Sequence, residues 1–127
     1  MKIKTSELTG AALDWAVAKC EGVEVEYIND GITRCLLRVS PFTGRYSPST
    51  IWAQGGPVIE REIGNLWKHN KLNSADADVW YAAAVHTSPD GTLLYYEDGL
   101  TPLIAAMRCY VASKLGDEVE IPNKLVL

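Results

Sequence analysis

The sequence has few of the residues on which catalysis and metal binding usually depend. Its two histidines, His69 and His86, stand 17 positions apart and lack the short spacing of helical metal ligands. The 3 cysteines include no Cys-x-x-Cys pair, and such an odd, scattered set indicates reduced thiols rather than disulfides or a zinc site. We therefore expect no cofactor, no metal site and no catalytic residue.

Long apolar runs and positive charge are scarce as well. No stretch approaches the ~20 apolar residues of a membrane span, and the first residues lack the apolar segment of an export signal. The chain carries 12 Lys and Arg against 16 Asp and Glu, a formal net charge of −4. General binding of duplex nucleic acid requires a basic surface. These absences predict a cytoplasmic protein that contacts neither a membrane nor duplex nucleic acid.

What the chain does contain is the composition of a globular protein. Hydrophobic residues make up 47% of it and charged residues 22%. A length of 127 residues fits a single domain over residues 1–127. A domain of that size buries enough apolar surface to fold without disulfides.

Helix signals lie near both ends of the chain. Thr5 or Ser6 can cap a first helix, and Gly22 can end it in the left-handed conformation. A second helix is predicted over residues 101–116, with a Thr-Pro start, apolar residues three and four apart, and a glycine stop.

Between the helices, apolar residues alternate with polar ones in pairs of short runs. Residues 23–28 and 32–39 are separated by a turn signal, as are residues 78–87 and 92–96, so both pairs predict hairpins. Residues 117–121 predict a short edge strand. The sequence thus predicts an α+β fold in which one antiparallel sheet of about four strands packs against the N-terminal and C-terminal helices.

Residues 45–57 predict a long irregular connection with unusual recognition chemistry. Pro57 is expected to open a short central helix that ends near Glu62, because its missing N–H costs nothing at that position. The preceding glycines would then offer free N–H groups and a positive helix end to an anion. Hydroxyls, a guanidinium and an aromatic face add to this chemistry. The candidate ligand-binding residues are Arg45, Ser47, Ser49, Thr50, Trp52, Gly55 and Gly56.

The same residues have a simpler interpretation. Prolines stiffen any long connection, hydroxyls cap local backbone groups, and Trp52 can fill the core. Connections of this length in a compact domain are nevertheless often functional. The sequence leaves open whether the segment binds a ligand or only packs.

Three ordered segments, residues 4–18, 47–62 and 101–119, resemble the NinX-like proteins of tailed phages and prophages. Together they span most of the chain. The resemblance implies a phage or prophage origin, the cytoplasm of a bacterial host, and a three-layer α-β-α sandwich with helices on both faces of the sheet. It implies no established activity.

Three functions are compatible with these features. The first is a small phage accessory protein that binds a host or phage protein, or a small anionic ligand, through residues 45–57. The second is a nucleotide-type ligand binder or sequestering protein that uses the same segment. The third is a small hydrolase-like enzyme, which needs His69 or His86 beside a carboxylate. We expect the first of these, and a homo-oligomer is compatible with it.

Overall fold

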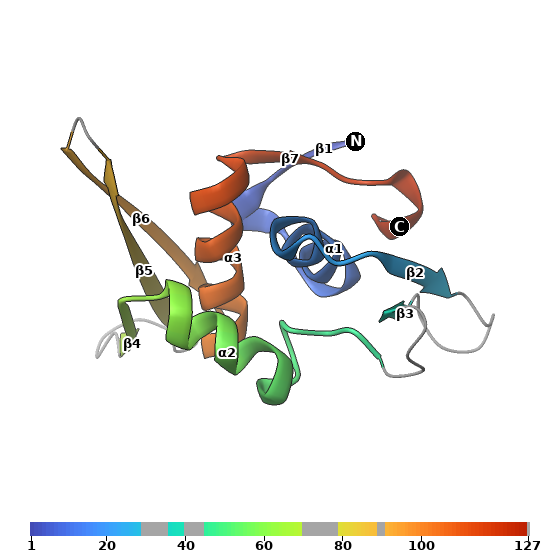
Figure 1. Ribbon diagram of the computed structural model, residues 1–127, viewed down its shortest axis with the longest axis horizontal. Helices are drawn as coiled ribbons and strands as arrows, with labels where there is room; N and C mark the ends of the chain where they lie inside the picture. The colour runs from blue at the N-terminus through green and yellow to red at the C-terminus, as the bar shows by residue number, and fades with distance from the viewer. Residues whose placement is uncertain (29–35, 40–44, 70–78, 89–90, 127) are drawn as a thin grey trace.

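The computed structural model describes residues 1–28, 36–39, 45–69, 79–88 and 91–126 (Figure 1). Its α-helices are α1 (Gly10–Glu21), α2 (Trp52–Glu62) and α3 (Pro102–Leu115), with 3-10 turns η1 (Thr5–Glu7) and η2 (Asn123–Leu125). Its strands are β1 (Lys2–Lys4), β2 (Val25–Ile28), β3 (Leu36–Val39), β4 (Asn65–His69), β5 (Val79–Ser88), β6 (Gly91–Gly99) and β7 (Glu118–Glu120). These helices and antiparallel strands confirm the predicted α+β class.

Helix α3 is the centre of the molecule. It contacts α1, α2 and all three strands of the sheet β4–β5–β6, and it stands between that sheet and α1 in Figure 1. A helix that is apolar on all sides belongs in the interior. The side of Ile104 and Arg108 is half-buried, and the buried residues cover most of the circumference of α3: Leu103, Ala105, Ala106, Met107, Cys109, Tyr110, Val111 and Ala112.

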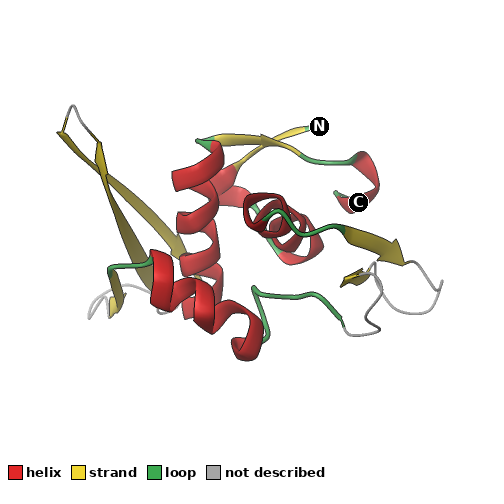
Figure 2. Ribbon diagram, in the orientation of Figure 1, coloured by secondary structure: helices red, strands yellow, loops and turns green. Residues whose placement is uncertain are grey.

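The strands are divided over several small sheets, and this corrects the expectation of one sheet of about four strands. In the described part of the chain, β1 pairs with β7, β2 with β3, and β4, β5 and β6 form a third sheet. Figure 2 shows these strands at separate places around the helices. Since α3 is buried over most of its circumference, strands and helices pack around it. The described helices α1 and α2 pack against α3. This arrangement differs from the α-β-α sandwich, in which helices cover both faces of one sheet.

Both predicted hairpins are present where the chain is described. Val25 pairs with Val39 in the first, and Trp80 pairs with Gly99 in the second. The turn of the first and residues 89–90 of the second lie outside the described residues. Three successive alanines, residues 82–84, are fully buried in β5. Their small side chains allow α3 to approach the strand closely, which explains alanine in a segment that pairs as a strand.

The predicted helix ends are partly correct. Thr101 caps α3 by accepting a hydrogen bond from the N–H of Ile104 at 3.1 Å, and Gly22 ends α1 with φ of +69°. Thr5 does not cap α1, which begins only at Gly10. Its hydroxyl instead donates to the Gly116 carbonyl at 2.6 Å. Thr5 is fully buried and joins the start of the chain to the end of α3.

Polar side chains join the ends of the three helices. Arg61 of α2 donates two hydrogen bonds from Nη2 to the Glu21 carboxylate of α1, at 2.8 and 2.7 Å. The Tyr110 hydroxyl of α3 donates to the same carboxylate at 2.8 Å. Glu21 therefore ties α2 and α3 to the last turn of α1. No described helix has the length and apolar character needed to cross a membrane.

Candidate functional site

The segment that leads into α2 forms a tight turn against the body of the protein. Its first residues pair with β3: Arg45 forms an antiparallel bridge with Arg38, and the Tyr46 N–H donates to the Leu37 carbonyl at 2.7 Å. The Ser47 carbonyl then accepts from the N–H groups of Thr50 and Ile51, at 3.0 and 2.8 Å. We call residues 47–50 the Ser47 turn. It reverses the chain just before α2 begins at Trp52.

Asp14 of α1 holds the Ser47 turn in place. Its Oδ1 accepts from the Ser49 N–H at 2.8 Å, and its Oδ2 accepts from the Ser47 hydroxyl at 3.2 Å. Asp14 is 4% exposed. Burial raises the pKa of this carboxyl above its ordinary value of 3.8, and the hydrogen bonds from Ser49 and Ser47 offset part of that rise.

Gln54 holds the same turn from the other side. Its Oε1 accepts from the Ser47 N–H at 2.6 Å, and its Nε2 donates to the Arg45 carbonyl at 2.6 Å. The residue at the N-cap of α2, Ile51, has no side chain that can accept a hydrogen bond. Gln54 thus fixes the entry into α2 from inside the helix, and it positions Arg45 next to the first helical turn.

The structure corrects the predicted start of the central helix. Helix α2 begins at Trp52, five positions before Pro57, and Pro57 lies inside it. The Gly55 N–H donates to the Ile51 carbonyl at 2.9 Å, so it is not a free donor for an anion. The physical reason is that the Ser47 turn, held by Asp14 and Gln54, starts the helix before the glycines.

The predicted site residues are divided between the interior and the surface. Ser47, Ser49 and Gly55 are buried, and Gly56 is half-buried. Gly55 lies against the Pro48 carbonyl and the side chain of Leu103, where no room exists for a β-carbon. Arg45, Thr50 and Trp52 are exposed, and they are the members of the predicted set that a partner can reach directly.

Trp52 stands out among the exposed residues. Its side chain is 55% exposed, so it does not fill the core. We call the exposed members of the predicted set, Arg45, Thr50 and Trp52, the Trp52 surface.

No local pattern in the sequence marks Asp14 as a partner of the Ser47 turn. Its neighbours Leu13, Ala16 and Val17 are fully buried, and a carboxylate among them needs hydrogen-bond donors. A charged residue inside the apolar stripe of a predicted helix was the available clue. Nothing in the sequence indicates which distant segment supplies the donors.

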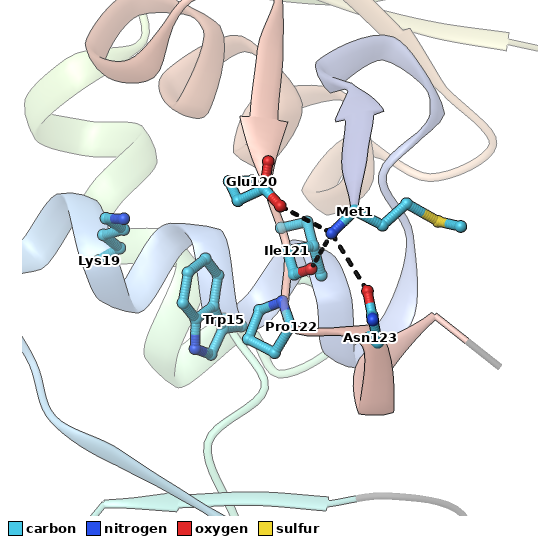
Figure 3. A pocket seen from close by; sticks show the side chains of 7 residues that line it. All are labelled: Met1, Trp15, Lys19, Glu120, Ile121, Pro122 and Asn123. Atoms are coloured by element: carbon cyan, nitrogen blue, oxygen red, sulfur yellow. Dashed lines mark hydrogen bonds and ion pairs between the residues drawn. The ribbon is translucent and has the colours of Figure 1, made fainter.

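A separate pocket of about 390 Å³ lies where α1 meets the end of β7. Figure 3 shows Trp15 beside Pro122 in it, with the Met1 nitrogen between Glu120 and Asn123. The Met1 nitrogen donates to Glu120 Oε1 at 2.8 Å, and this hydrogen bond lowers the pKa of the Glu120 carboxyl. These polar groups are therefore already paired with one another.

The two histidines do not share a site along the backbone. In the strand registers His69 stands opposite Val79, and His86 opposite Leu93. Residues 79 and 86 of β5 are seven positions apart, which corresponds to roughly 23 Å along a strand. The side chains of both histidines lie outside what the structure describes. Among the described residues, no group of three or more His, Cys, Asp or Glu is placed to hold a metal ion.

Comparison with known families gives a match over residues 4–114, to the family described as "Bacteriophage P22, NinX". The matched range includes two of the three segments on which the resemblance rested, residues 4–18 and 47–62, and most of the third. It confirms that resemblance. No curated protein matches the chain.

Proposed function

The chain belongs to the NinX family of bacteriophage P22, and we propose that this phage accessory protein acts by binding a phage or host protein through the Trp52 surface. The single observation that carries this proposal is the exposure of Trp52 at the first residue of α2. We place its action in the cytoplasm of the bacterial host.

A tryptophan in water leaves a large apolar surface without a partner. Tryptophan is among the residues that contribute most to protein interfaces, and such residues usually insert into a pocket of the partner. Arg45 and Thr50 add exposed polar groups from the same segment. This composition is typical of an interface with an apolar centre and a polar edge.

The fixed backbone that carries Trp52 also favours binding. The Ser47 turn immediately before it is joined to α1 by Asp14 and to α2 by Gln54. A side chain on a fixed backbone loses less conformational freedom on binding than one on a flexible loop. In this proposal the buried residues of the segment, Ser47 and Ser49, hold the surface in shape while Trp52 makes the contact.

The test is affinity capture from infected cells with the wild-type protein and three variants. We expect a phage or host protein that the wild type retains, that Trp52→Ala loses, and that Trp52→Phe recovers in part. Glu60→Ala is the control, because Glu60 is exposed on the same helix, eight positions after Trp52, and lies outside the Trp52 surface. Equal retention by wild type and Trp52→Ala of every captured protein would rule out the Trp52 surface.

A small anionic ligand is the second candidate. Ile51 provides no side-chain cap for α2, so an anion could bind at the N–H groups of the first two helical residues, Trp52 and Ala53. Gln54 holds Arg45 nearby. A thermal-shift screen with nucleotides tests this candidate. A ligand at a hundred times its dissociation constant adds about 2.7 kcal/mol of stability. The expected shift is lost in Arg45→Ala, and a panel without any shift excludes this class.

A further inference from the structure

Strand β6 forms one edge of the sheet β4–β5–β6, and no strand in the described part of the chain pairs with its outer side. The Ala83 carbonyl accepts from the Gly64 N–H at 2.9 Å, so the backbone groups of Ala83 face β4. Tyr96 stands opposite Ala83 and therefore directs its own N–H and C=O away from β5. Because these directions alternate along a strand, Leu94 shares the open edge with Tyr96.

The end of the same edge is closed by a side chain. Arg108 of α3 donates from Nη1 to the Asp98 carbonyl at 2.9 Å and from Nε to the Leu8 carbonyl at 2.7 Å. Asp98 lies two positions after Tyr96, so its carbonyl points to the same side as that of Tyr96. Arg108 thus covers the last residues of β6 and leaves the edge at Leu94 and Tyr96 open.

The open part of this edge lacks the features that usually prevent strands from pairing. Exposed edges are commonly protected by proline, lysine or an inward charge, and residues 92–96 contain none of them. Leu94 is 46% exposed and Tyr96 is 58% exposed. Trp67 packs edge-on against Tyr96 at 6.4 Å and stacks on Tyr81 at 5.7 Å between ring centres. These rings give the outer face of the sheet a fixed aromatic surface.

We propose that β6 pairs antiparallel with β6 of a second copy of this chain, so that two three-stranded sheets become one continuous sheet. A two-fold axis at Tyr95 places Leu94 opposite the second copy's Tyr96. The same axis places Tyr96 opposite the second copy's Leu94. Aliphatic and aromatic side chains stabilise each other across antiparallel strands. The alternation of the backbone groups fits this register, because Leu94 and Tyr96 both direct N–H and C=O to the seam.

The charges on β6 favour a second copy as the occupant. Glu97 falls opposite the second copy's Leu93, and Asp98, whose carbonyl is bound by Arg108, lies past the paired residues, so no like charges face each other across the seam. A net charge of −4 disfavours nucleic acid on this surface. Two-fold symmetry is the commonest arrangement of protein dimers, and it requires a surface that complements itself. The β6 edge has this property in the stated register.

Sedimentation velocity on the full chain tests the proposal, from about 10 μM to 1 mM, where weak dimers form. We expect the wild type to form dimers, and the double variants Leu94→Lys/Tyr96→Lys and Leu94→Glu/Tyr96→Glu to be monomers, because each places like charges at both seam pairs. An equimolar mixture of the two variants should restore the dimer. Circular dichroism verifies that each variant is folded, as expected for substitutions at exposed positions.

Three outcomes would contradict the proposed dimer or its register. A wild type that stays monomeric at the highest concentration overturns the proposal, as does a lysine double variant that still forms dimers. A mixture of the two variants that stays monomeric overturns the antiparallel register.

Hydrogen exchange provides an independent readout. Raising the dimerised fraction from about a tenth to about nine-tenths should slow exchange at the Leu94 and Tyr96 amides by about ninefold, because they are open only in the monomer. The Tyr95 amide faces β5 and should not respond. Unchanged exchange at Leu94 and Tyr96 would contradict the proposed pairing.

Discussion

The Asp14 carboxylate in the first helix accepts a hydrogen bond from the backbone N–H of Ser49, 35 residues later in the chain, at 2.8 Å. This contact joins α1 to the turn from which α2 starts. It also determines which parts of the segment 45–57 are interior and which are surface. The exposed position of Trp52 depends on it, and the first predictions concern this pair.

Removal of the Asp14 carboxylate should destabilise the protein strongly. In Asp14→Ala the Ser49 N–H and the Ser47 hydroxyl stay buried without their acceptor, which should lower the free energy of unfolding by about 2–4 kcal/mol. Urea denaturation measures this change. Glu60→Ala is the control, because Glu60 is exposed on α2 and its loss should change the value by less than about 0.5 kcal/mol.

Asp14 should also make stability depend on pH in a recognisable direction. Burial raises its pKa above 3.8, so the native state holds this proton more tightly than the unfolded chain does. Its contribution is complete below pH 3.8 and is lost as the pH rises through the raised pKa. The stability of wild type minus that of Asp14→Asn should therefore fall from about pH 3.5 to 6. A difference that grows over this range in urea titrations would contradict the role of burial.

Two neighbouring glycines in α2 should respond oppositely to alanine. A β-carbon on Gly55 would collide with the Pro48 carbonyl and lie 2.6 Å from Leu103 Cδ2, so Gly55→Ala should cost about 2–4 kcal/mol. A β-carbon on Gly56 meets nothing within 4 Å, and Gly56→Ala should add about 0.5–1 kcal/mol through helix propensity. Thermal or urea unfolding of both variants checks the pair. Equal effects would show that the close approach at Gly55 is absent.

The interaction between Arg61 and Glu21 should depend on the guanidinium group and not on the positive charge alone. Arg61→Lys keeps the charge but loses one of two hydrogen bonds from Nη2, and we expect a loss of about 0.5–1 kcal/mol. Arg38→Lys is the matched control, because it contacts Glu26 on an exposed hairpin and should change stability by less than about 0.5 kcal/mol.

Glu21 should also make stability depend on pH at acidic values, in the direction opposite to that of Asp14. Burial raises the pKa of the Glu21 carboxyl, but the hydrogen bonds from Arg61 and Tyr110 lower it by more, so the pKa in the folded protein is below 4.5. Its contribution to stability is present above pH 4.5 and is lost as the pH falls through the lowered value. Urea titrations between about pH 2 and 5 should show a smaller acid loss in Glu21→Gln than in wild type. An equal loss would contradict this assignment.

The thiol of Cys109 should be unreactive in the native protein. Burial raises its pKa to about 12, and the side chain is fully buried beneath β6. Iodoacetamide at about pH 8 should label it only as fast as the protein unfolds, and urea should accelerate the reaction. Mass spectrometry of the labelled peptides follows the site. Rapid native labelling at Cys109 would contradict its burial.

Local signals in the sequence were sufficient for the elements that depend on neighbouring residues. Thr101 caps α3 through a hydroxyl three residues from its donor, and Gly22 ends α1 through its own backbone conformation. Both hairpins follow from alternation beside a turn. The start of α2 was missed because its fixed entry depends on Asp14 and Gln54 rather than on a capping residue at Ile51.

The same distinction applies to the candidate site. The residue types in the segment 45–57 correctly marked it as unusual, but they could not separate Ser47 and Ser49, which face Asp14, from Thr50 and Trp52, which face solvent. That separation depends on a contact between residues far apart in the chain. The division of strands among several sheets was likewise hidden, because it follows from burial around most of α3.

The central position of α3 has a consequence for synthesis of the protein. The ribosome completes α1, α2 and the sheet β4–β5–β6 before it reaches residue 102, and each of them packs against α3. At about 5–20 residues per second, roughly 4–16 seconds pass between the synthesis of α1 and that of the first residues of α3. The nascent chain therefore exposes these apolar faces until α3 has been synthesised. Protection by chaperones during that interval, and not the final stability alone, should determine how much folded protein a cell obtains.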